Sequence, residues 1–269
     1  MRGIISYYVV LLFGVIVVGS ITMANGIFPA FPKNPLERLQ FEIGKVDNKG
    51  KNKQPALQLR AAKVKCPKKI GASFIVDTSG SMKQNKRMDA VKSALSEFAS
   101  DMPNDGLMSL YTYSDSVIEA VSLAPYGNAK EEFAEAVAKL TPRSETRTRD
   151  ALSFARQQLN LRRQQYPDYD MSVILISDGI PETAENNKRL RKNHQYDASQ
   201  DPTDIATALK NDGFTVYTVA IPDTLDETQN KKHQGIMKAA ASTPDDSYIP
   251  IYNEDLTTVI TKISKKMCD

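Results

Sequence analysis

Three oxygen-bearing side chains stand at alternate positions directly after an apolar run, in the segment FIVDTSGSM. Asp77, Ser79 and Ser81 supply one carboxylate and two hydroxyls, and a tight loop can turn all three toward one point. Hard oxygen ligands of this kind suit Mg²⁺, or another hard divalent cation such as Mn²⁺ or Ca²⁺, and do not suit a soft metal. The segment therefore predicts a divalent-metal site.

A second carboxylate, Asp178, follows the apolar run SVILIS, and between the two carboxylates the segment RSETRTRDALSFA offers Thr146 or Thr148. Two carboxylates and several neutral oxygens would nearly balance a divalent cation and leave one coordination position for a partner's carboxylate. Each element alone has a simpler interpretation, because Asp and Ser often cap helices and SDG is a common turn. The metal site is favoured because the elements occur together and in order.

Apolar runs alternate with helical patterns from Ile70 onward, which predicts a mostly parallel sheet with helices on both faces. Only Ser114 and Asp115 separate the second run from the third, too few residues for a parallel crossover, so we expect one antiparallel edge strand. Ligands of such sheets bind beyond the carboxyl ends of the strands, where Asp77 and Asp178 stand. The strand runs are GASFIV, LMSLYTY, SVIEAVSL, SVILIS, FTVYTVAI and SYIPIY, and the helical patterns span 86–102, 129–140, 150–165, 203–211, 228–240 and 255–266.

The order D-x-S-x-S, a threonine before a D-A-L helix and a later I-S-D-G resembles the metal-ion-dependent adhesion site of von Willebrand factor A domains. The resemblance covers residues 69–267. It implies a Rossmann-like fold with a six-stranded sheet. It also implies a ligand set in which the aspartates bind directly or through water: Asp77, Ser79, Ser81, Thr146 and Asp178.

The threonine loop both follows and departs from the family pattern. The family's threonine commonly stands four residues before the aspartate of D-A-L, which favours Thr146 over Thr148. The family usually has small residues around it, whereas this chain has Glu145, Arg147 and Arg149. These charges remove no ligand, but they bear on partner preference and on metal affinity.

The N-terminal segment is uncharged and apolar. After Arg2 no charged residue occurs before Lys33, and residues 4–21 read IISYYVVLLFGVIVVGSI. With its flanks the run can cross a hydrocarbon core of about 30 Å at about 1.5 Å per residue. Residues 1–24 are therefore predicted to be a single transmembrane anchor, and a signal peptide cleaved after Ala24, which would leave a secreted protein, is the alternative.

Residues 25–68 are interpreted as a proline-containing basic linker with a possible small hairpin, which leaves residues 69–269 as one domain. Between Lys33 and Lys69 there are eleven Lys or Arg and three acidic residues. A solvated linker is favoured, and contact with anionic lipid is the alternative. Nucleic acid is not expected as a partner, because no aromatic residues interleave the lysines.

The two cysteines flank the predicted domain, with Cys66 before its first strand and Cys268 after its last helix. In the family both termini emerge on the face opposite the metal, and some members join them by a disulfide. A Cys66–Cys268 bridge would require an oxidising compartment, so we expect the domain to lie outside the cytoplasm, in the periplasm or at the cell surface. Two unrelated free thiols are the alternative.

The sequence predicts a binding module and not an enzyme. Neither His194 nor His233 belongs to a catalytic motif, and both are expected to face solvent. An aspartic protease is excluded because Ser79 interrupts the D-T-G triplet and no second copy follows. The favoured function is capture of an Asp or Glu of a protein partner by the bound metal, within an envelope or surface assembly. A structural scaffold whose metal only stabilises loops, and a non-catalytic subunit of a chelatase-like ATPase system, are the alternatives.

Overall fold

The computed structural model describes residues 66–222, 226–251 and 255–269. All of them belong to the second of the two units into which the chain divides, Met1–Leu59 and Arg60–Asp269. They form an α/β fold around a six-stranded sheet of order β3-β2-β1-β4-β5-β6. The β2–β3 pair is antiparallel and every other pair is parallel, so the predicted sheet with one antiparallel edge strand is confirmed. The strands are β1 Ile70–Asp77, β2 Leu107–Tyr113, β3 Val117–Pro125, β4 Asp170–Ser177, β5 Thr215–Ala220 and β6 Ser247–Tyr248.

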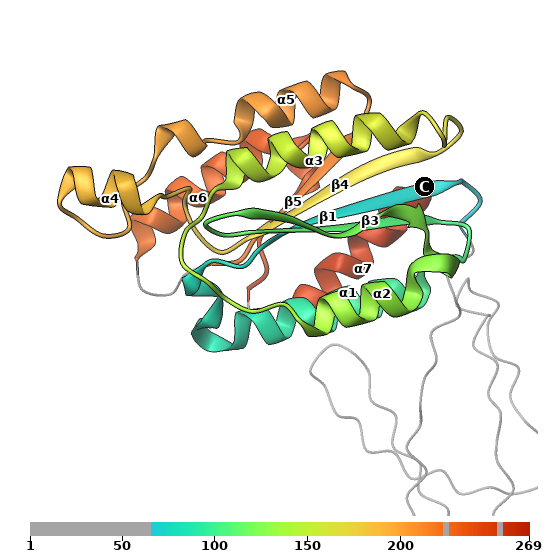
Figure 1. The fold of residues 1–269 in the computed structure, drawn as a ribbon, viewed down its shortest axis with the longest axis horizontal. Coiled ribbons are helices and arrows are strands. Elements are labelled where there is room, and N and C mark those ends of the chain that lie inside the picture. The colour runs from blue at the N-terminus through green and yellow to red at the C-terminus, as the bar shows by residue number, and fades with distance from the viewer. Residues whose placement is uncertain (1–65, 223–225, 252–254) are drawn as a thin grey trace, which may run out of the picture. The chain divides into compact units, whose positions relative to one another are not determined.

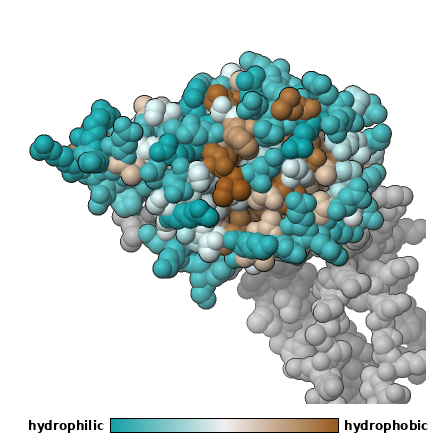
Figure 2. Space-filling view, viewed as in Figure 1, coloured by the Kyte–Doolittle hydropathy of each residue, from teal (hydrophilic) through white to brown (hydrophobic). Residues whose placement is uncertain are grey.

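Helices cover both faces of the sheet, with α1, α2 and α7 on one side and α3, α5 and α6 on the other (Figure 1). The short helix α4 lies beyond the carboxyl ends of the strands, and its surface in the same view is hydrophilic (Figure 2). The α-helices are α1 Arg87–Asp101, α2 Tyr126–Ala138, α3 Thr148–Arg163, α4 Ala184–Leu190, α5 Thr203–Asn211, α6 Glu227–Ala240 and α7 Asp255–Cys268, and the 3₁₀ helices are η1 Gly80–Lys86, η2 Ala198–Gln200 and η3 Pro244–Asp246.

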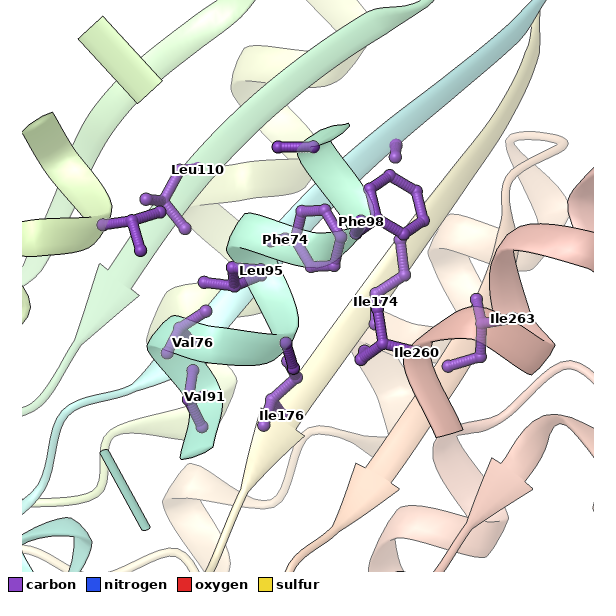
Figure 3. Packing of buried hydrophobic residues seen from close by; sticks show 14 of the residues in the cluster. Phe74, Val76, Val91, Leu95, Phe98, Leu110, Ile174, Ile176, Ile260 and Ile263 are labelled. Atoms are coloured by element: carbon purple, nitrogen blue, oxygen red, sulfur yellow. The ribbon is translucent and has the colours of Figure 1, made fainter. Parts of the chain in front are cut away.

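The central strand β1 is buried along its whole length because helices cover it on both sides. Its alternate side chains enter different cores: Phe74 and Val76 pack under α1 and α7, and Ile75 packs under α3. The rings of Phe74 and Phe98 meet edge to face, with centroids 4.9 Å apart, and Ile260 and Ile263 of α7 join the same cluster (Figure 3). The two cores hold the strands in fixed register, and thereby the residues at the strand ends.

The sheet order places the first strand next to the fourth. The chain leaves β1 toward β2 on one side and leaves β4 toward β5 on the other, so the connections diverge between β1 and β4. Such a point of divergence, at the carboxyl ends of parallel strands, leaves a crevice in which ligands commonly bind. Asp77 ends β1, and Asp178 directly follows β4.

The last predicted strand is shorter than its sequence pattern. Of the described part of the run SYIPIY, residues 247–251, only Ser247 and Tyr248 pair with β5. Pro250 lacks the N–H group that a strand needs for its ladder, and Ile251 is 76% exposed. The described part of this run therefore forms a strand of two residues.

Cys66 and Cys268 form a disulfide with a Cα–Cα distance of 5.0 Å. The bridge lies where the C-terminus is marked, at the end of the sheet away from α4 (Figure 1). No helix among the described residues is long and apolar enough to cross a membrane. The predicted anchor at residues 4–21 and the possible hairpin of the linker lie outside the described residues.

Candidate metal site at the strand ends

Asp77 is fully buried at the end of β1, and the loop that follows it folds back onto its carboxylate. Its Oδ1 accepts a hydrogen bond from the backbone N–H of Ser79 at 2.7 Å. Its Oδ2 accepts one from the hydroxyl of Ser177, the last residue of β4, at 2.6 Å. These bonds fix both oxygens at the junction of the two neighbouring strands.

The two loop serines connect this carboxylate to the second one. The hydroxyls of Ser79 and Ser81 lie 3.0 Å apart, and the Ser81 hydroxyl donates to Oδ1 of Asp178 at 2.7 Å. Asp178 is 2% exposed and Ser79 is 1% exposed. Four of the five predicted ligands, separated by up to 101 residues in the sequence, therefore form one cluster of oxygens.

The threonine loop packs directly on the serine loop. A Cβ at Gly80 would lie 2.8 Å from the carbonyl oxygen of Arg143, so this close approach requires glycine. The Arg143 N–H donates to the carbonyl of Thr78 at 2.6 Å, which joins the two loops. Thr146 is 3% exposed, and its backbone pairs with Glu182 through two hydrogen bonds of 3.1 Å. The predicted fifth ligand thus lies between the serine loop and the chain that follows Asp178.

Thr148, the alternative threonine, is the first residue of α3 and is 2% exposed. Its hydroxyl has no hydrogen-bond partner among the described residues. The same holds for the hydroxyl of Tyr113, which is also buried at the end of β2. Ser177 and Thr148 nevertheless lie close enough to the Tyr113 hydroxyl to lower its pKa, so these three hydroxyls are neighbours beside the oxygen cluster.

The site concentrates negative charge away from solvent. Burial, with a further contribution from the nearby Asp178 carboxylate, raises the pKa of Asp77 to about 7, although hydrogen bonds from Ser177 and Ser79 act in the opposite direction. Burial and the charge of Asp77 also raise the pKa of the Tyr113 hydroxyl well above its usual value. Two buried carboxylates of this kind are stabilised by a cation between or beside them.

A buried arginine, which the sequence analysis did not single out, supplies part of that positive charge. Arg87 begins α1 and donates from Nη1 to Oδ2 of Asp178 at 2.7 Å, with side-chain exposures of 1% and 0%. A sequence signal for its burial exists, because Arg87 stands four and eight residues before the core residues Val91 and Leu95 and so shares their helix face.

His233, expected to face solvent, is instead buried in α6 at 2% exposure. Neither ring nitrogen has a hydrogen-bond partner among the described residues. Burial, together with the charge of Arg87, lowers its pKa to about 4. The expectation was wrong because the apolar residues Ile236, Met237 and Ala240 bring this face of the helix against the core. His194 is exposed, as expected.

The charges around Thr146 largely neutralise one another. Nε of Arg147 lies 2.7 Å from a carboxylate oxygen of Glu145, and Nη2 of Arg149 lies 2.6 Å from one of Asp204 in α5. Arg149 thereby connects the start of α3 to α5, whereas Arg147 pairs within the threonine loop. Although Glu145, Arg147 and Arg149 depart from the family pattern, they therefore add little net charge beside Thr146.

The side chains present fit a hard cation better than a soft one. No group of three or more His, Cys, Asp or Glu side chains that could hold a metal occurs among the described residues. The cluster instead combines two carboxylates with hydroxyls, a set of hard oxygen donors.

The chain matches the model of a known family. A family model described as von Willebrand factor type A domain matches residues 73–266. The chain belongs to the von Willebrand factor type A domain family. No curated protein matches the chain.

Several solved structures share the fold at low sequence identity. The von Willebrand factor domain of the type V pili tip protein Mfa5 from Porphyromonas gingivalis is 14% identical with a TM-score of 0.58, covering 74% of this chain and 94% of that one. The pilus adhesin SpaC from Lactobacillus rhamnosus GG is 18% identical with a TM-score of 0.61, covering 75% of this chain and 31% of that one. The proximal thread matrix protein 1 from the mussel byssus, solved with a zinc-occupied MIDAS motif, is 18% identical with a TM-score of 0.59, covering 76% of this chain and 49% of that one. This chain therefore corresponds to only a part of SpaC and to only a part of the mussel protein.

Proposed function

We propose that this domain binds a divalent cation, Mg²⁺, and uses it to capture an acidic side chain of a protein partner. The proposed ligands are Asp77, Ser79, Ser81, Thr146 and Asp178. The observation that carries the proposal is the cluster of buried oxygens, in which the pKa of Asp77 is raised to about 7 by burial and by Asp178. A cation there would relieve this cost and would offer an open coordination position to a carboxylate.

The residues of the chain have separate parts in this proposal. Ser177 and the backbone of Ser79 hold the Asp77 carboxylate in place, and Arg87 holds that of Asp178. With both carboxylates ionised, as a bound cation would favour, and with Arg87 counted, the site carries one net negative charge, so a divalent cation leaves an excess of one positive charge. A partner's carboxylate would neutralise that excess, which favours an acidic ligand over a neutral one.

The solved relatives support a metal and a protein partner without identifying either. One of them has zinc in its MIDAS motif, and two others are pilus proteins. Mg²⁺ is proposed here over zinc because every candidate ligand is an oxygen. No catalytic role is proposed, since His194 is exposed and His233 is buried without a hydrogen-bond partner among the described residues.

The metal is tested by calorimetric titration of the full chain with Mg²⁺ and with Zn²⁺. Asp77→Asn is expected to weaken Mg²⁺ binding more than tenfold, that is by more than about 1.4 kcal/mol. Asp168→Asn is the matched control, because Asp168 is 75% exposed and contacts Lys69 away from the site. Unchanged Mg²⁺ binding in Asp77→Asn would refute the ligand set, and tighter binding of Zn²⁺ than of Mg²⁺ would refute the choice of cation.

Capture of a carboxylate is tested with a synthetic peptide that has one Asp among Gly and Ser residues. The peptide is expected to bind in Mg²⁺ and to dissociate in chelator, and its Asp→Asn form is expected not to bind. Equal binding of both forms would contradict capture by the metal. If chelator lowers only the melting temperature and leaves peptide binding unchanged, the metal has a structural role alone.

We further propose that residues 4–21 tether the domain to a membrane and that the domain lies outside the cytoplasm. The Cys66–Cys268 disulfide supports this location, because such bridges persist in oxidising compartments. A reporter enzyme that is active only after export should be active when it is fused after Asp269. Activity of a cytoplasmic reporter at the same position would overturn the location and favour the chelatase-like alternative.

A further inference from the structure

The chain between Pro181 and Asp197 makes an excursion from the metal-bearing face. The N–H of Asp197 donates to the carbonyl of Pro181 at 2.8 Å, so the excursion leaves and returns at one point. That point adjoins the site, because Glu182 pairs with the backbone of Thr146. Helix α4 extends from there past the strand ends (Figure 1).

Polar contacts within the excursion give it a defined structure. Thr183 caps α4 and donates its hydroxyl to Asp197 at 2.6 Å, and the side chain of Asn186 donates to the carbonyls of Gln195 and Tyr196 at 3.3 and 3.2 Å. Lys232 of α6 lies 3.5 Å from the ring centroid of Tyr196 and so attaches the returning chain to the body of the domain. A compact, internally bonded loop of this kind loses little conformational entropy when it binds.

Charge is segregated along this excursion. Its cations gather at the end of α4, where all four are exposed and none forms an ion pair with a carboxylate among the described residues; we call them the basic tip: Lys188, Arg189, Arg191 and Lys192. The three carboxylates of the excursion lie nearer its base: Glu182, which contacts His194 at 3.3 Å, Glu185 in the first turn of α4, and Asp197, which accepts from the hydroxyls of Thr183 and Ser199. The excursion between Pro181 and Asp197 therefore carries four cations against three carboxylates, with the cations together at its outer end.

Other cations lie around the same face. Lys83 and Lys86 are exposed on η1, which continues from the serine loop, and Arg143 is exposed beside Gly80. The projecting end of the molecule is correspondingly hydrophilic (Figure 2). A surface with this charge attracts an acidic partner and repels a basic one before any short-range contact forms.

We propose that the basic tip is a second contact for the partner captured at the metal, and that it binds a run of Asp or Glu residues flanking the captured carboxylate. This inference rests on the proposed function. Glu182 at the base pairs with the proposed ligand Thr146, and α4 from Ala184 to Lys188 extends about 8 Å beyond that base at about 1.5 Å per residue. An extended peptide covers that distance in about three residues. The acidic run is therefore placed a few residues from the captured side chain.

The test uses the full chain in Mg²⁺ and two labelled peptides, followed by fluorescence anisotropy. One peptide has a single Asp in a Gly-Ser background, and the other adds four Glu beginning about three residues after that Asp. The tip variant replaces all four cations by glutamine. The control variant makes the same change in net charge with exposed lysines near the disulfide end or on the distal part of α6: Lys68→Gln, Lys238→Gln, Lys262→Gln and Lys265→Gln.

In the wild type and in the control variant, the Glu-containing peptide is expected to bind about tenfold more tightly than the plain peptide at low salt. This difference in affinity should disappear near 1 M salt, because the screening length is then only about 3 Å. In the tip variant both peptides should bind with the plain peptide's affinity. If the wild type does not distinguish the peptides, or if the control variant loses as much as the tip variant, the inference is wrong.

Asp77→Asn separates this inference from the proposed function. If it abolishes Mg²⁺-dependent binding of both peptides while the tip variant binds like wild type, only the basic tip is refuted. If Asp77→Asn changes nothing, the proposed function fails, and two-point recognition fails with it. The same variants are also tested with phosphatidylserine vesicles and with a single-stranded oligonucleotide. If either binds more tightly than the Glu-containing peptide and this binding depends on the basic tip, the choice of an acidic protein partner is wrong.

Discussion

Nη1 of Arg87 donates to Oδ2 of Asp178 at 2.7 Å, while Oδ1 of the same carboxylate accepts from Ser81 at 2.7 Å. One carboxylate is thus shared between an internal cation and the candidate metal site. The guanidinium is almost completely buried, and its Nη2 also donates to the carbonyl of Pro222 at 3.5 Å. Asp178 is therefore held in a fixed orientation by Arg87 and Ser81.

Removing the charge of Arg87 should destabilise the metal-free protein and increase its dependence on metal. Arg87→Met removes the positive charge that lies against the buried Asp178 carboxylate, which costs about 3–5 kcal/mol. The more negative site should then gain more stability from Mg²⁺ than the wild-type site does. Urea unfolding in chelator and in Mg²⁺ measures both effects. Arg87→Lys, which keeps the charge, is the matched control, and an identical Mg²⁺ dependence in the two variants would contradict this role.

The two threonines of the loop should respond differently to substitution. Thr146→Ala is expected to weaken Mg²⁺ binding about tenfold, which corresponds to about 1.4 kcal/mol. Thr148→Val removes a buried hydroxyl whose polar neighbour is that of Tyr113, so it should leave metal binding unchanged and change the free energy of unfolding by no more than about 1 kcal/mol. Calorimetric titration and thermal unfolding of both variants check this. The reverse pattern, with metal binding lost in Thr148→Val, would show that Thr148 is the ligand.

The strand ends were predictable because their signals are local. An apolar run followed at once by Asp77 or Asp178 is read directly from the sequence, and α5 occupies the predicted residues Thr203–Asn211. The sheet order could be anticipated only through the family resemblance, since pairing of β1 with β4 joins segments about 100 residues apart.

Arg87 and the α4 excursion were not predictable in the same way. The helix face of Arg87 is visible in its spacing from Val91, but its carboxylate partner is 91 residues away. Helix α4 has only seven residues and no apolar stripe, so periodicity does not reveal it. It is stabilised by the Thr183 cap and by contacts with the returning chain. Such tertiary contacts become visible only in the folded molecule.

His233 should resist protonation across the mildly acidic range. Its pKa is lowered to about 4 in the folded protein, against 6.5 for an ordinary histidine, so between these values the unfolded chain binds the proton and the folded chain does not. The contribution of His233 to the free energy of unfolding is therefore fully present above pH 6.5. It decreases as the pH falls toward 4, by about 3 kcal/mol in all.

The measurement is an NMR titration of the imidazole signals in His194→Gln, which leaves His233 as the only histidine of the 269-residue chain. Its signal should not shift between pH 8 and 5. A midpoint near 6.5 would mean that the ring is solvated and that its burial does not hold in solution. Asp77 acts in the opposite direction, because its raised pKa favours the folded state as the pH falls. Comparing the free energy of unfolding of wild type with that of His233→Gln over the same pH range therefore separates the effect of the histidine from that of Asp77.

The disulfide should stabilise the domain without affecting the metal site. Cys66 and Cys268 are 202 residues apart in sequence, and in the loop-entropy model a bridge over that length contributes about 5 kcal/mol. Reduction, or the double substitution Cys66→Ser/Cys268→Ser, is expected to lower the midpoint of urea unfolding. Mg²⁺ affinity should stay the same, because the bridge joins Cys66, before β1, to the end of α7, whereas Asp77 lies at the far end of the 8-residue strand β1. A loss of Mg²⁺ affinity in the folded, reduced protein would show instead that α7 transmits changes from the termini to the metal site.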